Sequence, residues 1–544
     1  MELISQHTKA IMEGCKARAS AAGLVFEDET LEYIVTNRDL LELGPKNMIP
    51  TLYDYWVNDV ELLREKGRYE LYPGNPYETV INTRPAISFY NDNNPDWLNV
   101  MIFYHVLAHI DFFQNNLFFA RTWNDDFNGR ALADKRLIAK LRADKGRQLD
   151  YVIEFARGMD NLVGYFRELS RSGREGKTRP GRLDYYFDVF LQQERKVPVH
   201  DYLKEVDRYN ALLKKYADQA ERLFFAEVIR DHPEFEALFA KSGQERKVEA
   251  LDAMDHVLEH SAFLNRSENR WMKSVIQVVR DTSVFFQPQI RTKIMNEGWA
   301  SYWHNRLFLT DDRIRGHEVD YARVNAGVTA MPRVGLNPYA LGMKLFEYLE
   351  ESSDKGRYRW DFQKVRDHDR RRAWDAGTGE GRGLIFQVRR ELCDFTFVNR
   401  FLEQDFLDRN HLFVAGRRLN RSRMVWEYFV RSRKVEDYRE MILHHLYHPP
   451  FVQVDAGRSV EGLLYLDHRF EGKPLLAEFV PAVLMGIEYL WGNTVKLETS
   501  ERVDDGPHKG KVTDDGDEDA PPRELKFRRV VYTMKNRKLT RTNL

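Results

Sequence analysis

Two histidines stand four residues apart in an apolar, aromatic stretch, YHVLAHIDFFQNN at residues 104–116. On an α-helix His105, His109 and Asn116 fall on one stripe, because residues three or four apart share a face. Burying two imidazoles without partners would be costly, so something must satisfy them. A divalent metal ion is one solution, since two histidines at this spacing can direct ring nitrogens at one ion.

A third ligand is expected from a second apolar segment, MNEGWASYWH at residues 295–304. Glu297, Ser301 and His304 share a helical face there. Glu297 is followed by Gly, Trp and Ala, an apolar setting in which a lone carboxylate would be expensive. Two histidines and one glutamate with an open position form the ligand set of one type of catalytic zinc site. The sequence therefore predicts that His105, His109 and Glu297 bind zinc or another divalent metal.

A catalytic site of this kind also needs groups that orient the ligands and move a proton. The candidates to orient the ligands are polar residues of the two segments, Asn116, Asn296 and Ser301. In an HExxH zinc helix the glutamate after the first histidine accepts the proton, but here that position is Val106. We therefore expect His304 to be the catalytic acid–base group, with Asp111 as a second candidate.

A purely structural role is the alternative for both segments. Hydrogen-bonded core histidines are the commoner explanation of an isolated HxxxH pattern, and NEGWA on its own is compatible with helix packing. The three histidines of HHLYH, at residues 444–448, lie beside two prolines and are better explained as a surface cluster.

The composition describes a large protein of balanced charge. The chain has 544 residues, and its formal net charge is -1, so it has no global field that would hold nucleic acid, although local patches remain possible. Cys15 and Cys393 are far apart and suggest neither a disulfide framework nor a metal knuckle. We see no signal peptide and no membrane-spanning stretch. We therefore expect a cytoplasmic protein with no nucleic-acid partner.

The hydrophobic patterns predict a mainly α-helical protein with a small C-terminal α+β domain. Residues 1–448 form the helical core domain, with helices over 1–70, a strand near Tyr77–Asn82 and a charged helical section at about 130–250. Residues 449–500 read as a β-β-α-β unit. Residues 501–523 are polar and charged, which predicts a disordered linker. In residues 524–544, KFRRVVYTMK is expected to return as an edge strand before a short tail.

Four segments resemble the stage V sporulation protein R (SpoVR-like) family over about residues 40–500. They are HVLAHIDFFQNN, TKIMNEGWASYWH, GLNPYALGMKLFEYLEE and VRRELCDFTFVNRFL. The resemblance implies a link to sporulation and spore cortex formation. It also implies a functional link to a serine kinase and to a von Willebrand-type domain protein, whose genes often neighbour those of relatives. EGWA is in addition similar to the third-ligand helix of some gluzincin peptidases, which implies a zincin-like helical metal site.

These observations together predict a zinc-dependent hydrolase of peptide or amide bonds. A peptide derived from the cell wall is the substrate class that the cortex association implies. The alternative is a non-catalytic sporulation or stress-response factor that binds partner proteins through the same pocket.

Overall fold

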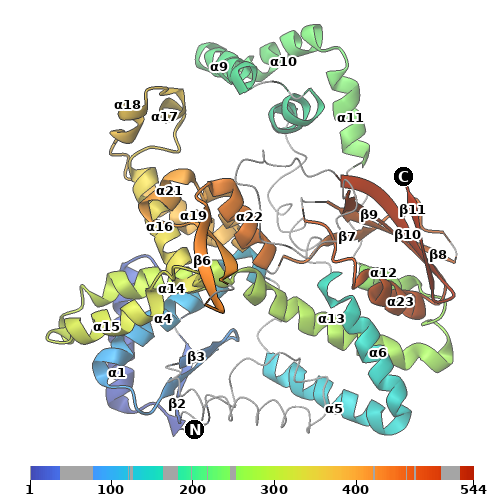
Figure 1. Ribbon diagram of the computed structural model, residues 1–544, viewed down its shortest axis with the longest axis horizontal. Helices are drawn as coiled ribbons and strands as arrows, with labels where there is room; N and C mark the ends of the chain where they lie inside the picture. The colour runs from blue at the N-terminus through green and yellow to red at the C-terminus, as the bar shows by residue number, and fades with distance from the viewer. Residues whose placement is uncertain are drawn as a thin grey trace.

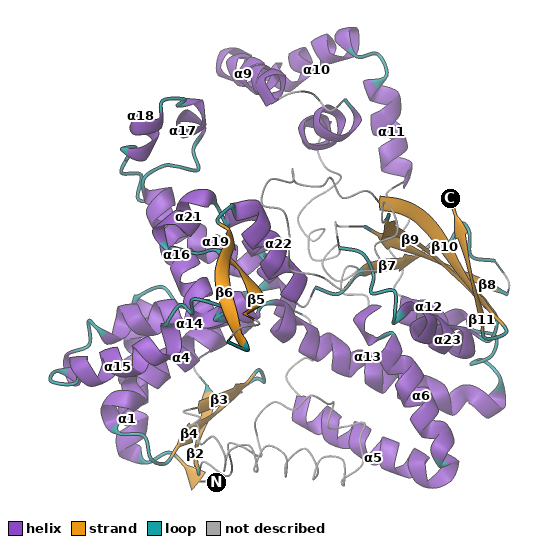
Figure 2. Cartoon of the chain, viewed as in Figure 1, coloured by secondary structure: helices purple, strands orange, loops and turns teal. Residues whose placement is uncertain are grey.

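The computed structural model describes most of the chain and is mainly helical, as predicted, with strands near both ends (Figures 1 and 2). Outside the described residues lie 1, 28, 37–38, 40–77, 121, 123–126, 163–181, 196, 198, 217–218, 246–252, 421–422, 447, 461, 471–472 and 504–526. The predicted linker at 501–523 therefore falls almost wholly outside them.

One hydrophobic core joins the N-terminal helices to those of residues 293–445 (Figure 1). Its helices are α1 (Gln6–Ala21), α4 (Asp96–Asn115), α14 (Lys293–Phe308), α15 (Glu318–Thr329), α16 (Pro338–Asp354), α19 (Gly381–Glu391), α20 (Asp394–Phe401), α21 (Gln404–Arg409) and α22 (Val435–His445). The helix α14 packs between α4 and α16. The two segments predicted to carry metal ligands thus lie side by side.

A four-stranded sheet lies beside this core, where the sequence predicted helices and one strand. Its order is β1 (Glu2–Leu3), β2 (Thr30–Val35), β4 (Ala86–Asn91) and β3 (Glu78–Ile81). Strands β2 and β4 are parallel and β3 pairs antiparallel with β4. The expectation of helix at residues 30–35 was wrong, because this segment pairs as a strand with both β1 and β4.

A second core joins central helices to the C-terminal sheet. The helices are α5 (Phe127–Lys145), α6 (Arg147–Gly158), α12 (Ala253–His260), α13 (Arg270–Arg291) and α23 (Val480–Trp491). The sheet order is β11 (Lys538–Asn543), β10 (Phe527–Lys535), β9 (Thr494–Arg502), β8 (Leu463–Arg469) and β7 (Phe451–Val454). The sheet shares its apolar core with α6 and α13, so this core crosses the boundary predicted at residue 449.

Within KFRRVVYTMK, residues Phe527–Lys535 form β10, which is an interior strand and not an edge strand. It pairs with β9 on one side and with β11 on the other. The terminal residues Lys538–Asn543, which the sequence analysis assigned to a tail, supply that edge. Both neighbours run antiparallel to β10, and β10 and β11 are joined by a two-residue turn at Asn536 and Arg537.

A third, smaller apolar cluster holds the charged section of residues 182–245 together. Its helices are α8 (Arg182–Asp184), a π-helical segment (Tyr185–Glu194), α9 (Val199–Tyr216), α10 (Ala220–Asp231) and α11 (Phe235–Glu245). Figure 1 shows α9, α10 and α11 at the top of the view, apart from the helices that carry the predicted ligands. Two short helices, α17 (Trp360–Lys364) and α18 (His368–Arg372), lie in the loop after α16.

Candidate metal centre

The helix α4 holds both histidines in the interior of the protein. Its residues from Leu98 to Phe113 are all buried, so the helix is surrounded and its polar side chains cannot turn to water. The rings of His105 and His109 are 4.6 Å apart, centroid to centroid, and are almost perpendicular. Burial, together with the neighbouring rings of His109 and His304, lowers the pKa of His105 well below its ordinary value. The His105 imidazole is therefore neutral and can be a ligand.

The helix α14 places Glu297 opposite these histidines. The Asp394 carboxylate accepts hydrogen bonds from the backbone N–H groups of Ile294 and Met295, both 2.8 Å long, and so satisfies two donors at the helix start. Burial nevertheless raises the pKa of Asp394 to about 7. One turn later Gly298 meets Gly342 of α16, where a Cβ would lie 2.4 Å from Gly342 backbone atoms. Asp394 fixes the start of α14, and the two glycines fix its crossing with α16. Together these contacts set the position of Glu297.

Three ligand atoms converge between the two helices. The Glu297 Oε2 atom lies 3.6 Å from His109 Nε2 and 3.9 Å from His105 Nε2. All three atoms lie within 4.8 Å of one another. Both gaps exceed hydrogen-bond length, and Glu297 Oε2 is buried without a hydrogen-bond partner in the described structure. The sequence-predicted trio is thus brought together, with a buried carboxylate oxygen at its centre.

A chain of hydrogen bonds sets the protonation of His105. His304 Nε2 lies 2.9 Å from Asn325 Oδ1, and Asn325 turns its Nδ2 to Asn305 Oδ1 at 3.4 Å, so the Asn325 oxygen faces the ring. An oxygen there requires a proton on His304 Nε2, which leaves His304 Nδ1 as an acceptor. His105 Nδ1, 2.9 Å from that atom, then donates to it. His105 Nε2, which lies 3.9 Å from Glu297 Oε2, therefore carries the free lone pair.

His109 is oriented in the same way. Its Nδ1 lies 2.9 Å from Asn296 Oδ1, so Nδ1 carries the proton and Nε2 keeps its lone pair. Asn296 immediately precedes Glu297 on α14. The donor set is thus two bare imidazole nitrogens and one carboxylate, with no hydrogen among them, and this set fits a divalent cation. Tetrahedral zinc ligands lie roughly 3.3 Å apart, so these atoms, which lie within 4.8 Å of one another, would move closer together around a bound ion.

The other predicted site residues divide into two groups. His304 and Asn296 contact the histidines, as described above. Asn116 instead donates to the backbone carbonyls of Arg389 and Leu392 at 2.6 and 3.0 Å, so it ties α4 to the end of α19. Ser301 is buried, and its hydroxyl has no partner among the described residues.

Asp111 lies on the other side of α4, about 200° around the helix from His109. It accepts hydrogen bonds of 2.8 Å from Trp299 Nε1 and from the backbone N–H of Val25, and it lies 3.4 Å from Arg389. Burial raises the pKa of Asp111 to about 6 despite that guanidinium. These contacts make Asp111 a link between α4, α14 and α19 and take its carboxylate away from the three ligands.

Sequence reasoning did not find two further residues beside the ligands. Burial, and next the charge of Glu297, raise the pKa of Glu78, at the start of β3, to about 7. Tyr339 of α16 stacks on the His105 ring at 6.1 Å, and burial and the nearby Glu297 raise the pKa of its hydroxyl well above the ordinary value. The spacing of residues in the sequence does not reveal either of them, because each lies on an element that approaches the three ligand candidates only in the folded protein.

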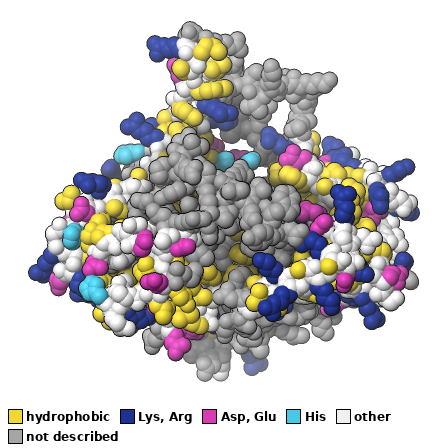
Figure 3. Space-filling view, turned by 90° about the horizontal axis from the view of Figure 1, so that it is seen from below, with side chains coloured by type: hydrophobic (Ala, Val, Ile, Leu, Met, Phe, Trp, Pro, Cys, Tyr) yellow, Lys and Arg dark blue, Asp and Glu magenta, His cyan; other side chains and the backbone are white. Residues whose placement is uncertain are grey.

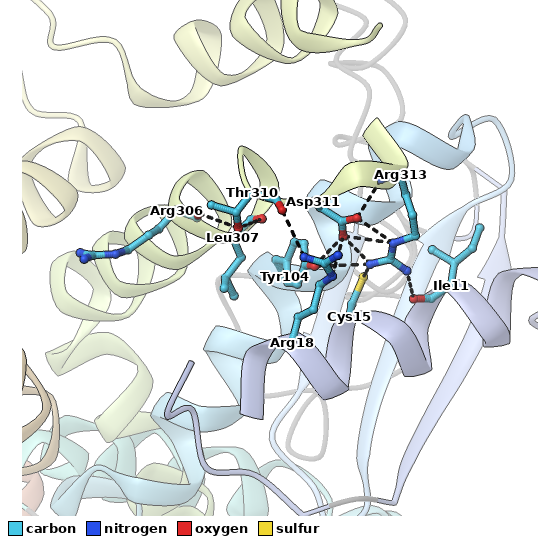
Figure 4. Close-up of polar contacts among 9 residues, drawn as sticks. All are labelled: Ile11, Cys15, Arg18, Tyr104, Arg306, Leu307, Thr310, Asp311 and Arg313. Carbon is cyan, nitrogen blue, oxygen red and sulfur yellow. Dashed lines mark hydrogen bonds and ion pairs between the residues drawn. The ribbon is translucent and has the colours of Figure 1, made fainter. Parts of the chain in front are cut away.

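A polar network links the middle of α4 to α1 and to the segment after α14 (Figure 4). Tyr104, next to His105, donates a 2.6 Å hydrogen bond to Asp311, which also binds the Arg313 guanidinium. Arg313 reaches α1 through the backbone carbonyl of Ile11 at 2.9 Å and the thiol of Cys15 at 3.2 Å. Burial raises the pKa of Cys15 to about 11, so the thiol stays protonated. The network therefore braces α1, α4 and the segment after α14.

A family model described as SpoVR like protein matches residues 2–448, which include every residue of the candidate centre. The chain belongs to the SpoVR-like family. The match ends just before β7, so the C-terminal sheet lies beyond it. The chain is also similar to an uncharacterized protein, YcgB, of Escherichia coli (strain K12). It is 23% identical over 381 residues, which cover 68% of this chain and 67% of the relative.

No solved structure matches the chain. Among the described helices, none is both long and apolar enough to cross a membrane. The two cysteines are both buried and free.

Proposed function

We propose that this SpoVR-like protein is a metal-dependent hydrolase of peptide or amide bonds, with cell-wall peptides as its substrate class. The convergence of three acceptor atoms, His105 Nε2, His109 Nε2 and Glu297 Oε2, carries the proposal. A carboxylate beside two imidazole lone pairs is unfavourable in a buried site unless a cation binds there. When bound, a divalent ion such as zinc supplies a Lewis acid and lowers the pKa of a water molecule towards about 7.

Glu78 is proposed as the proton acceptor that Val106 cannot provide. Its carboxyl lies close enough to Glu297 for their charges to interact, and it comes from a different element, so it is not tied to the ligand geometry. A general base works best when its pKa is near the working pH. A cation beside Glu297 would offset the charge of that residue and lower the pKa of Glu78, which favours the ionised, proton-accepting form.

Tyr339 and His304 complete the assignment. The raised pKa of Tyr339 keeps its hydroxyl protonated, so it can donate to the negative charge that develops on a substrate carbonyl oxygen. His304 has both ring nitrogens engaged, and burial lowers its pKa to about 4. We therefore assign His304 to the orientation of His105 and not, as the sequence suggested, to proton transfer.

The test compares wild type, Glu297→Gln and Glu78→Gln for zinc content and for cleavage of cell-wall peptides and a panel of simple peptide and amide substrates. Glu297→Gln is expected to lose metal and activity together, whereas Glu78→Gln keeps metal and loses activity. Glu391→Gln, at an exposed site on α19, is the matched control and should change neither.

Zinc-loaded wild type that cleaves nothing in this panel would overturn the hydrolase. The alternative, a non-catalytic sporulation or stress-response factor, would then be favoured if a partner such as a serine kinase or a von Willebrand-type domain protein binds wild type but not Tyr339→Phe. The link to those partners remains a prediction from the family.

A further inference from the structure

A two-stranded hairpin stands between α21 and α22. It consists of β5 (Val414–Asn420) and β6 (Val425–Ser432), and no third described strand pairs with it (Figure 2). Phe429 covers Gly416 on one face, where a Cβ on the glycine would lie 2.4 Å from the ring. An isolated two-stranded hairpin is only marginally stable, and the contact of Phe429 with Gly416 packs its two strands together.

The opposite face carries exposed aromatic side chains. Trp426 and Tyr428 are 56% and 60% exposed, and Val430 continues the same alternation along β6. Leu419 lies directly across from Trp426, and Arg417 across from Tyr428, so all five side chains share one face. Large exposed aromatic side chains that gather on one face mark a binding surface more often than scattered ones do.

The hairpin is also strongly cationic. Residues 411–434 contain seven lysines and arginines but one acidic residue, Glu427, whereas the whole chain has 83 basic and 84 acidic residues. Glu427 is already paired with Arg418 at 3.4 Å. Arg417, Arg423 and Arg431 are exposed and have no carboxylate partner among the described residues. Figure 3 shows cationic and anionic side chains interspersed over the described part of the face seen from below.

We propose that this hairpin binds single-stranded nucleic acid. The strand rise of about 3.4 Å per residue separates the backbone positions of Trp426 and Tyr428 by about 7 Å, a spacing that leaves room for bases to stack on the two rings. Arg417 lies over the Trp426 ring, 5.0 Å from its centroid, and its guanidinium remains able to meet a phosphate. The neutral net charge that argued against nucleic acid is an average over the chain, and this hairpin is a local exception.

The chemistry of the face favours this ligand over two others. An acidic protein segment would supply carboxylates to the arginines but nothing flat for the exposed rings. Duplex DNA or RNA would supply phosphates, but its bases are already stacked on one another and cannot cover Trp426 or Tyr428. An unpaired strand offers planar bases and negative phosphates in regular alternation along its whole length.

Binding is tested on the full chain by fluorescence anisotropy with labelled 20-nucleotide oligo(dT) and oligo(U) from 50 to 200 mM salt. The aromatic variant is Trp426→Ala with Tyr428→Ala, and the charge variant is Arg417→Gln with Arg431→Gln. All four side chains are exposed, so the variants should fold, which circular dichroism and melting temperature verify. Tyr151→Ala and Arg270→Gln, exposed on α6 and α13, are the matched controls.

We expect wild type to bind, and the aromatic variant to bind at least tenfold more weakly. In the charge variant the negative slope of log affinity against log salt should become shallower by about 1.4, for two lost phosphate contacts. Both controls should bind as wild type does. No binding at 50 mM salt, binding that the aromatic variant leaves unchanged, or equal binding of a 20-bp duplex would overturn the proposal. If labelled poly-glutamate binds more tightly than the oligonucleotides through the same residues, an acidic protein partner would replace nucleic acid as the proposed ligand.

Discussion

Gly298 of α14 and Gly342 of α16 lie in backbone contact directly beside the metal-ligand candidate Glu297. A Cβ on Gly342 would lie 2.1 Å from the backbone carbonyl oxygen of Ile294, and a Cβ on Gly298 would overlap Gly342. The two helices can therefore approach this closely only while both residues are glycine. The glycine of NEGWA thus has a packing role that sets where the adjacent carboxylate points.

Gly298→Ala is expected to push α14 and α16 apart. The added methyl group meets backbone atoms, which cannot rotate away, so the variant should lose about 1–3 kcal/mol of stability or more and bind zinc more weakly. Gly327→Ala on α15 is the control, because a Cβ there meets nothing within 4 Å. The control should be neutral or stabilising by up to about 1 kcal/mol. Equal melting temperatures and zinc affinities for the two variants would show that the crossing tolerates a side chain.

Helical spacing paired His105 with His109, and the apolar setting of Glu297 selected the third ligand candidate on another helix. These signals could not separate Asn116 and Asp111 from the residues that contact the cluster. Their partners, Arg389 and Trp299, come from other helices, and no periodicity encodes which helix lies alongside. Glu78 and Tyr339 were missed for the same reason.

His304 is expected to act on zinc affinity through His105. His304→Ala removes the acceptor of the His105 proton, and such orienting partners change metal affinity by roughly 10–100-fold. Asn325→Ala should have a similar effect, and the double variant should be no worse than His304→Ala, because both act through one chain of hydrogen bonds. Competition against a chromophoric chelator measures the affinity, with exposed His260→Ala as the control. Full zinc affinity in His304→Ala, with activity lost, would return His304 to the role of proton acceptor.

Asp311 should make stability depend on pH in the acid range. Burial alone would raise the pKa of Asp311, but hydrogen bonds from Arg313 and Tyr104 outweigh it and lower the pKa to about 2. The ordinary value is about 3.9, so the stabilisation, about 2 kcal/mol, is complete above that pH and is lost as pH falls towards 2. Urea unfolding from pH 5 to 2 should show the advantage of wild type over Asp311→Asn shrinking. The exposed neighbour Asp312, changed to Asn, should leave the pH profile unchanged.

Some elements of the fold could likewise be predicted from local sequence patterns, whereas others depend on tertiary contacts. Helices such as α4, α14 and α16 have apolar patterns long enough to be recognised. The strand predicted near residues 77–82 corresponds to β3, but β2 was not predicted, because it is short and pairs in parallel with a strand more than fifty residues later. The shared core of α6 and α23 is also tertiary: Phe155 packs on Tyr489 at 4.8 Å and lies against Gly486.

Residues 504–526 are expected to be dispensable for the C-terminal sheet, because the strands on either side already meet. Arg502, the last residue of β9, lies directly opposite Phe527, the first of β10, in an antiparallel pair. A two-residue Asn-Gly turn between them should therefore replace residues 503–526, since this turn has the twist that joins adjacent antiparallel strands. Differential scanning calorimetry should give a melting temperature within about 2 °C of wild type, because no described contact of the sheet is removed. Val531→Pro in the shortened chain is the control for sheet integrity: proline removes a ladder donor from an interior strand, so melting should fall sharply. A comparable fall from the shortening alone would mean that the replaced residues contribute to the packed core, against their composition.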